Sequence, residues 1–129
     1  MTYAFSSLEE LGDNYGFRKV RGPLGVTAFG VNAIVMPPQY EGPEHYHDTQ
    51  DELYFVHSGR ARVQVGGETR ELGPGGLFHC ESTTPRRISN ASDSEDLVVF
   101  VVGGKGGYVE RDGHLTSDAE LAKRQGMSS

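Results

Sequence analysis

The sequence predicts an all-β fold, a small sandwich or barrel, with one short helix near its C-terminus. Short apolar segments with strand-like patterns follow one another from about residue 20 to residue 102, separated by turn-forming residues. The 129 residues include 18 glycines and six prolines, which supply the many turns that short strands require. At this length we expect one domain, with a core large enough to fold without disulfides.

The first elements are a helical turn and a strand. Residues 6–13 combine a serine at the cap position, acidic residues in the first turn and Gly12 as a stop, which predicts a short helix. Residues 26–37 predict a strand pair or one long bent strand. The consecutive prolines Pro37 and Pro38 close this strand, because proline lacks the N–H that a sheet needs.

Residues 51–59 predict a strand whose side chains alternate tightly between two faces. One face carries Glu52, Tyr54 and Val56, and the other carries Leu53, Phe55 and His57. A site that uses Glu52 is therefore on the opposite side of the strand from His57, which we expect in an outer layer or interface.

Three further segments complete the predicted sheets. Residues 60–72 predict a hairpin in which Gly66 and Gly67 supply the positive φ angles of a two-residue turn. Residues 73–82 predict a Pro-Gly turn and a strand. Residues 96–104 are continuously apolar, which predicts a strand covered on both faces.

A helical pattern replaces the strand pattern at residues 116–126. Ser117 and Glu120 have the spacing of a capping box, in which the glutamate side chain returns to the cap residue. Lys123 and Arg124 are expected in the last turn, where cations favour the helix dipole.

Composition excludes several partners and locations. The net charge of −6 argues against nucleic acid and anionic membranes as partners. No apolar run reaches the length of a membrane span, and the N-terminus lacks the pattern of a signal peptide. The single cysteine, Cys80, cannot form an internal disulfide, which suits a reducing compartment. We therefore expect a cytoplasmic protein.

His45, His47 and Glu52 form the candidate metal site. Residues i and i+2 of a strand point to the same side, so both imidazoles can face one point. A polar turn then reverses the chain and places Glu52 opposite them, on the adjacent returning strand. Two imidazole nitrogens and one carboxylate suit a divalent transition ion with open positions. The alternative is a solvated turn in which the histidines titrate freely and Glu52 pairs with an arginine.

The spacing His45-x-His47-x4-Glu52-x6-Gly59 resembles the first motif of the cupins, and residues 74–90 resemble the second. This resemblance implies a single-domain jelly-roll barrel, or double-stranded β-helix. It further implies a pocket between the sheets and a homodimer. It covers about residues 24–104 as the barrel core, which leaves residues 1–23 as an N-terminal arm and residues 105–129 as a C-terminal segment.

Arg86 stands where the second cupin motif supplies a histidine as fourth metal ligand. Arginine has no lone pair to offer a cation. In one interpretation the ion has three protein ligands, and Arg86 binds an anionic oxygen of the substrate. In a second the pocket is metal-free, and Glu52 forms an ion pair with Arg86. In a third His79 supplies the missing ligand, although His79 is out of register with the motif.

Other candidate residues have simpler interpretations. Tyr54 shares the face of Glu52 and either lines the pocket, as a substrate-binding residue, or belongs to the core. We expect His114 and Arg87 in solvent and Cys80 buried as a small apolar group.

The functional hypothesis is a cupin that binds Fe, Mn, Ni or Zn and a small, oxygen-rich anionic ligand. It could be a dioxygenase, isomerase or decarboxylase, because this fold supports all three activities. The alternatives are a non-enzymatic ligand-binding protein and a purely structural domain, so the sequence leaves open whether the protein is an enzyme.

Overall fold

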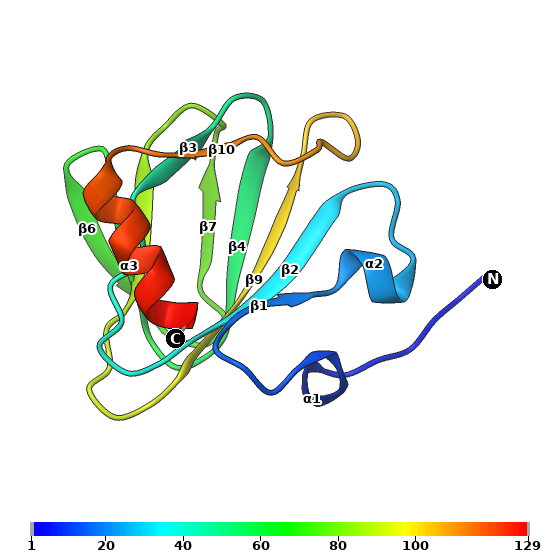
Figure 1. Ribbon diagram of the computed structural model, residues 1–129, viewed down its shortest axis with the longest axis horizontal. Helices are drawn as coiled ribbons and strands as arrows, with labels where there is room; N and C mark the ends of the chain where they lie inside the picture. Colours follow the sequence, from blue (N-terminus) through cyan, green and yellow to red (C-terminus); the bar gives the residue numbers. More distant parts are fainter. Residues whose placement is uncertain (1, 129) are drawn as a thin grey trace.

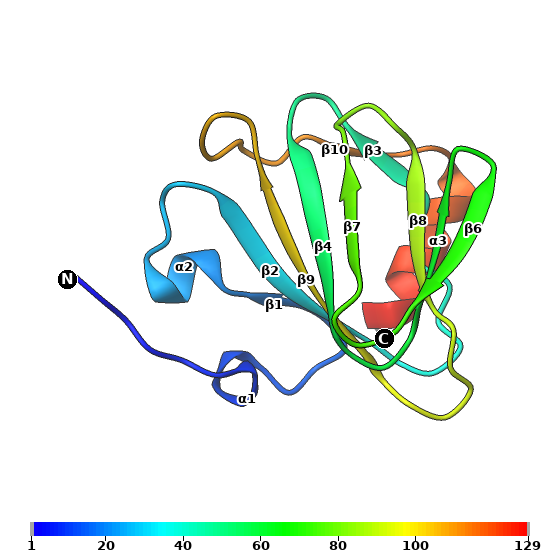
Figure 2. The ribbon, with the colours of Figure 1, turned by 180° about the vertical axis from the view of Figure 1, so that it is seen from behind.

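The computed structural model describes residues 2–128, with side chains up to Lys123. This part of the chain forms two five-stranded antiparallel sheets that face each other (Figures 1 and 2). The first sheet has the order β1 (Gly16–Lys19), β2 (Gly30–Met36), β9 (Leu97–Gly104), β4 (Asp51–Ser58) and β7 (Leu77–Cys80). The second has the order β10 (Gly113–Leu115), β3 (His45–His47), β8 (Arg86–Asn90), β5 (Ala61–Val65) and β6 (Glu68–Leu72). The predicted all-β jelly-roll class is confirmed.

The core lies between the two sheets, and both sheets contribute to it. Its buried members include Ile34, Met36, Val56 and Val99 from the first sheet and Ala61, Val63 and Ile88 from the second. Along β4 the predicted alternation is present, because Tyr54 and Val56 are buried while Leu53 and Phe55 are exposed. The inner face of β4 therefore carries Glu52 toward the interior of the barrel.

Two of the local predictions are confirmed in detail. Helix α1 (Leu8–Leu11) begins after Ser7, whose hydroxyl oxygen accepts a hydrogen bond from the Glu10 amide. Strands β5 and β6 form a hairpin, and both Gly66 and Gly67 have positive φ angles in its turn.

The first sheet differs from expectation in two places. Residues 26–37 contain a single strand, β2, and its partner is β1 from the N-terminal arm, which the sequence pattern did not indicate. Strand β9 alternates between buried and half-buried residues, so the prediction that it is covered on both faces is wrong. Its outer side chains are shielded by apolar neighbours on β2 and β4 in place of a second layer.

Helix α3 (Asp118–Ser128) is present, but its predicted contacts are not. The Glu120 carboxylate does not form a capping box; it bonds Arg87 at 2.6 and 2.9 Å and accepts a hydrogen bond from the Glu44 amide at 3.1 Å. Arg87 is thus largely buried under α3 and does not face solvent as expected. Lys123 is not in the last turn, because the helix continues to Ser128.

The remaining helix, α2 (Arg21–Leu24), is a single turn between β1 and β2. No helix in residues 2–128 combines the length and apolar character needed to cross a bilayer.

Candidate metal centre

Two elements from different sheets position the candidate ligands. Strand β3 belongs to the second sheet and presents His45 and His47 on the same side, as the i, i+2 spacing predicts. Strand β4 belongs to the first sheet and presents Glu52 from its inner face. The prediction that Glu52 lies on a strand adjacent to the histidines is therefore wrong, because the turn at residues 48–50 carries the chain from one sheet to the other. The three side chains meet between the sheets.

The three potential ligand atoms are close enough to share one ion. They all lie within 4.8 Å of one another. Glu52 Oε1 is 3.0 Å from His47 Nε2 and 3.7 Å from His45 Nε2. Metal–ligand bonds of about 2.0–2.2 Å place neighbouring donor atoms roughly 3–3.5 Å apart, which is similar to this spacing.

The outer nitrogens of both imidazoles have acceptors. His45 Nδ1 lies 3.3 Å from the Pro43 carbonyl oxygen, and His47 Nδ1 lies 2.8 Å from Asp112 Oδ1. An acceptor at Nδ1 holds the proton there and leaves the Nε2 lone pair toward Glu52. Both rings therefore have the orientation that a metal ligand needs.

His47 Nε2 is a buried polar atom without a hydrogen-bond partner in the described part of the chain. It faces the carboxylate oxygen of Glu52, and two electron-rich atoms this close repel unless a cation or a proton lies between them. Burial lowers the pKa of His47, but Glu52 and Asp112 outweigh burial and raise it. The donor set thus fits a divalent transition ion, and a proton is the competing occupant.

Glu52 is ionised in this environment. Burial alone would raise its pKa, but the contacts with His45, His47 and Tyr54 hold the pKa well below its ordinary value. The Tyr54 hydroxyl donates to the same oxygen, Oε1, that faces the histidines. At neutral pH a negative charge is therefore available at this point of the barrel.

Arg86 lies beside the cluster and is fully buried. It pairs in register with His45 across β8 and β3, so it occupies the position next to the candidate ligands. Its guanidinium donates from Nη2 to Glu52 Oε1 at 3.1 Å and from Nε to the Tyr54 hydroxyl at 3.4 Å. Nη1 donates to the carbonyl oxygens of Ser82 and Thr84, both at 2.9 Å. This is the Glu52–Arg86 pair of the second interpretation.

Tyr54 is also buried, and its ring stacks on Phe78 at a centroid distance of 5.6 Å. Its hydroxyl links Glu52 to Arg86. Arg86 and Tyr54 thus contact the candidate ligand Glu52 directly, while His45, with a quarter of its side chain exposed, forms the solvent-facing edge of the cluster.

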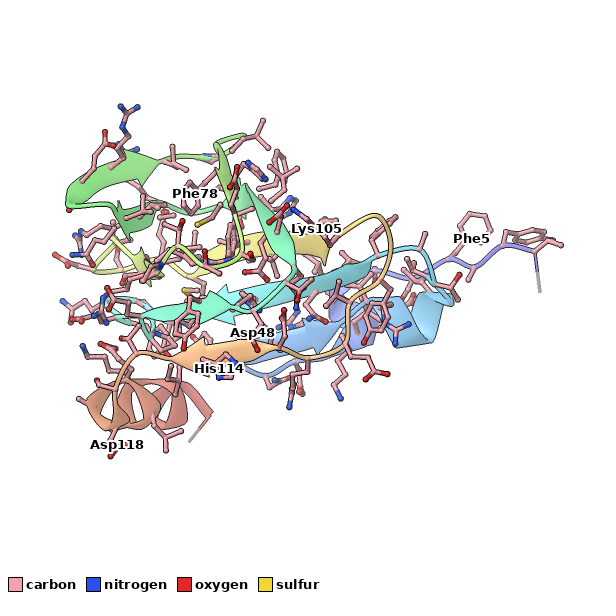
Figure 3. The ribbon with its side chains drawn as sticks, turned by 90° about the horizontal axis from the view of Figure 1, so that it is seen from above. Phe5, Asp48, Phe78, Lys105, His114 and Asp118 are labelled. Atoms are coloured by element: carbon pink, nitrogen blue, oxygen red, sulfur yellow. The ribbon has the colours of Figure 1, made fainter. Side chains whose placement is uncertain are left out.

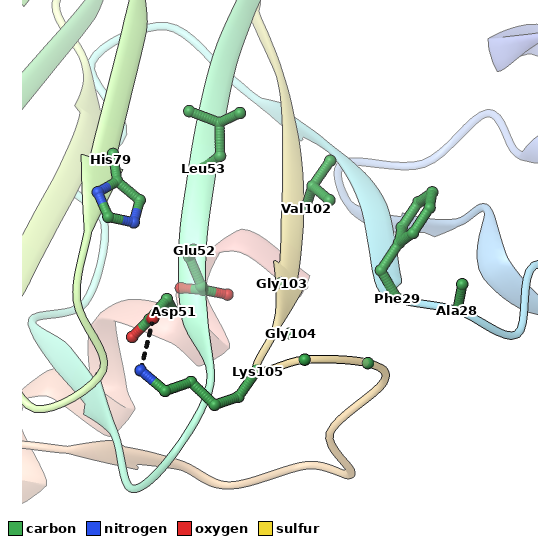
Figure 4. A pocket seen from close by; sticks show the side chains of 12 residues that line it. Ala28, Phe29, Asp51, Glu52, Leu53, His79, Val102, Gly103, Gly104 and Lys105 are labelled. Atoms are coloured by element: carbon green, nitrogen blue, oxygen red, sulfur yellow. Dashed lines mark hydrogen bonds and ion pairs between the residues drawn. The ribbon is translucent and has the colours of Figure 1, made fainter.

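The structure does not bring His79 into the cluster. Cys80, not His79, lies in register with Glu52; His79 pairs with Leu53 on the outer face of the first sheet. There it lines a surface hollow of about 290 Å³ together with Leu53 and the Asp51–Lys105 ion pair (Figure 4). Cys80 is buried, as expected.

The remaining histidines also lie outside the cluster. His57 is on the exposed outer face of β4, where its ring meets Phe100 edge to face. His114 is half-exposed but is not simply solvated, because its Nε2 lies 2.7 Å from Asp48 Oδ2 and its ring stacks on Tyr46 (Figure 3).

Asp112 is the site residue that sequence reasoning missed. It lies 65 residues from His47 along the chain, in the C-terminal segment and outside both motifs. An aspartate before a glycine is typical of an ordinary turn, so the sequence contains no signal for its contact with an imidazole.

A family model described as a cupin domain matches residues 32–114 of this chain. An uncharacterized protein of Streptomyces coelicolor is 42% identical over 53 residues. That match covers 41% of this chain and 49% of the relative, so the chain matches about half of the relative's length.

Several solved structures have the same fold. A cupin protein of Bacteroides fragilis is 24% identical with a TM-score of 0.69, covering 92% of this chain and 95% of that one. A sugar phosphate isomerase of Silicibacter pomeroyi is 19% identical with a TM-score of 0.72, covering 89% and 82%. A DMSP lyase of Ruegeria pomeroyi is 21% identical with a TM-score of 0.66, covering 89% and 60%. At these identities the likeness concerns the fold.

Proposed function

Because the chain belongs to the cupin family, we propose that it binds a divalent transition-metal ion through His45, His47 and Glu52. The observation that carries this proposal is the convergence of three potential ligand atoms within 4.8 Å, with the buried Nε2 of His47 3.0 Å from the ionised carboxylate of Glu52. Both imidazoles are already held with Nε2 toward that carboxylate. Iron, manganese, nickel and zinc all accept such a ligand set.

We further propose that the metal-loaded protein is an enzyme acting on a small, oxygen-rich anion. When bound, the ion would supply Lewis-acid polarisation of an oxygen or a site for dioxygen. The partly exposed edge at His45 is where a ligand would approach.

In this proposal Arg86 and Tyr54 serve the ligand chiefly through Glu52. Both are buried and both donate to its carboxylate, so they fix the position of that side chain. Direct binding of a substrate anion by Arg86 would require its guanidinium to leave the carbonyl oxygens of Ser82 and Thr84.

A metal-free ligand-binding protein is the second candidate. The observation that favours it is the Glu52–Arg86 contact of 3.1 Å, in which a fully buried cation already neutralises the carboxylate. A metal ion would have to share Glu52 with the Arg86 cation. The positive charge of Arg86 weakens the attraction of the Glu52 carboxylate for the metal ion.

Metal content distinguishes the two candidates. We expect untagged wild-type protein to contain near-stoichiometric transition metal by elemental analysis and to lose it in His47→Ala and Glu52→Ala. His57→Ala is the matched control, since this histidine faces the outside of β4. A wild-type protein that stays empty after metal loading would exclude the first candidate, and gain of metal by Arg86→His would then favour the second.

Two further features complete the proposal. The single cysteine is buried and unpaired, which supports a cytoplasmic location. The exposed apolar side chains on the outer face of the first sheet support a homodimer.

A further inference from the structure

We propose that Asp112 is a positioning residue that holds His47 with Nε2 free for the metal, which makes the C-terminal segment part of the metal centre. The inference rests on the proposed function, since it assigns a role toward the same ion. It concerns residues 105–115, which cross one end of the barrel before α3 (Figure 1).

Both carboxylate oxygens of Asp112 have two partners. Oδ1 lies 2.8 Å from His47 Nδ1 and 2.7 Å from the side-chain nitrogen of Gln50. Oδ2 accepts from the backbone amides of Thr49 at 2.7 Å and Gln50 at 3.0 Å. One side chain therefore fixes both the imidazole and the turn that leads from β3 to Glu52.

The backbone around Asp112 brings this carboxylate close to the ring. The Asp112 carbonyl accepts from the Asp48 amide at 3.3 Å, and Gly113 pairs in register with His47. A Cβ at Gly113 would lie only 3.1 Å from His47 Cε1. Glycine thus permits an approach of β10 to the imidazole that a side chain would crowd.

The chemistry of this contact is specific to one tautomer. A carboxylate accepts hydrogen bonds and donates none, so its contact with Nδ1 holds the His47 proton on Nδ1. The Nε2 lone pair is then available to a cation, and the charged acceptor makes that nitrogen a stronger donor to metal. An aspartate that only anchored the C-terminal segment would not need to contact His47.

The substitution Asp112→Asn separates the role of orienting His47 from the role of anchoring the turn at Thr49 and Gln50. An asparagine has one oxygen and one NH₂ group, and the amides of Thr49 and Gln50 require the oxygen at the Oδ2 position. The NH₂ group then faces Nδ1 and donates to it, and the Gln50 side-chain amide turns its oxygen toward the same NH₂ group. This moves the imidazole proton to Nε2 and blocks the metal ligand while the turn keeps its two hydrogen bonds.

The test measures Zn²⁺ affinity by competition titration and the His47 tautomer by ¹⁵N NMR of the metal-free protein at alkaline pH. We expect Asp112→Asn to bind Zn²⁺ about 10–100-fold more weakly than wild type. Wild-type His47 should carry its proton on Nδ1, and the variant should carry it on Nε2. Glu110→Gln is the matched control, because it removes an exposed carboxylate of the same segment and should bind like wild type.

Zn²⁺ affinity of Asp112→Asn equal to that of Glu110→Gln would overturn the inference, as would a wild-type His47 with its proton on Nε2. Thermal unfolding of each variant checks that the fold persists, and the wild-type tautomer needs no variant at all. A wild-type protein that binds no Zn²⁺ would refute the proposed function instead. The tautomer measurement then decides separately whether Asp112 orients His47.

Discussion

Glu52 is both a candidate metal ligand and the ion-pair partner of Arg86. Its Oε1 accepts hydrogen bonds from Tyr54 and from Arg86, and the same atom faces the Nε2 atoms of both histidines. The Arg86 guanidinium lies 3.1 Å from this carboxylate, and its charge reduces the attraction of Glu52 for a second cation. We infer that an arginine at position 86, where the second cupin motif has a histidine, lowers the affinity for metal. The same arginine stabilises the barrel interior when no metal is bound.

Arg86→Ala should lower the free energy of unfolding by about 3–5 kcal/mol, because removing one partner of a buried ion pair leaves the other charge uncompensated. The carbonyl oxygens of Ser82 and Thr84 each lose one of their donors as well. Urea unfolding of the metal-free protein measures this effect.

Arg70→Ala is the control for that measurement. Arg70 also contacts a carboxylate, that of Glu68 at 2.6 Å, but both side chains are exposed. Exposed pairs of this kind contribute about 0.2–1 kcal/mol. If both substitutions destabilise the protein equally little, the Glu52–Arg86 pair is not structurally important.

At the scale of elements, a buried carboxylate on α3 is a central contact between this helix and the second sheet. Glu120 is 5% exposed and contacts Arg87, Lys123 and the Glu44 amide. The Arg87 hydrogen bond, against the effect of burial, lowers the pKa of Glu120 to about 2. The residue therefore links the helix to β8 and to the segment that precedes His45.

This contact predicts a pH dependence of stability. The folded-state pKa of Glu120 lies below its ordinary value of 4.5, so its contribution is complete above that value and is lost as pH falls toward 2. At neutral pH we expect Glu120→Gln to destabilise the protein by about 1.5–3 kcal/mol. The difference from wild type should shrink at about pH 3, measured by thermal unfolding.

Glu68→Gln is the comparison for this pH series, because it removes an exposed carboxylate that is paired with Arg70. Its stability should stay close to that of wild type at both pH values. A destabilisation by Glu120→Gln that is independent of pH would show that the carboxylate charge does not hold the helix.

The sequence predicts those parts of these elements that depend on local periodicity. Alternation along 51–58 places Glu52 and Tyr54 on the inner face correctly, and the Gly66-Gly67 pair predicts its hairpin turn. The i, i+2 spacing likewise brings His45 and His47 to one side.

The remaining features depend on how the C-terminal segment folds back, and local patterns carry no information on that. Glu120 reaches Arg87 across 33 residues, and Asp112 reaches His47 across 65. Ser117 and Glu120 have capping-box spacing, but a buried arginine attracts the carboxylate more strongly than the cap amide does. Local patterns also do not predict the change of sheet between β3 and β4, because a hairpin and a corner between two sheets have similar turn residues.

At the scale of the whole molecule, the outer face of the first sheet is exposed along β4 and β7, whereas Ala33 and Val35 on the outer side of β2 are buried. A row of apolar side chains crosses it, with Phe55 in register with Leu77 on one side and Phe100 on the other. Leu77 is 62% exposed. Ordinary monomers rarely expose large contiguous apolar patches.

The start of the N-terminal arm also exposes apolar side chains. Residues 2–7 of this arm, which precede α1, extend away from the barrel (Figures 1 and 3) and include Tyr3 and Phe5, which are 74% and 89% exposed. Their rings contact each other, with centroids 5.9 Å apart. The exposed apolar side chains of the extended residues and of the outer faces of β4 and β7 together support a second copy of the chain as their occupant.

We therefore expect a homodimer that buries at least about 1,200 Å² in total, the lower range of stable interfaces. Sedimentation equilibrium should give twice the mass of one chain, with dissociation in Phe55→Asp because a carboxylate in an apolar interface lacks a partner. Leu121→Asp is the matched control, since Leu121 is exposed to a similar degree but lies on α3. The double substitution Tyr3→Ser, Phe5→Ser measures how much the arm contributes to the stability of the dimer. A wild-type monomer at all concentrations, or equal dissociation by Leu121→Asp, would contradict this use of the sheet.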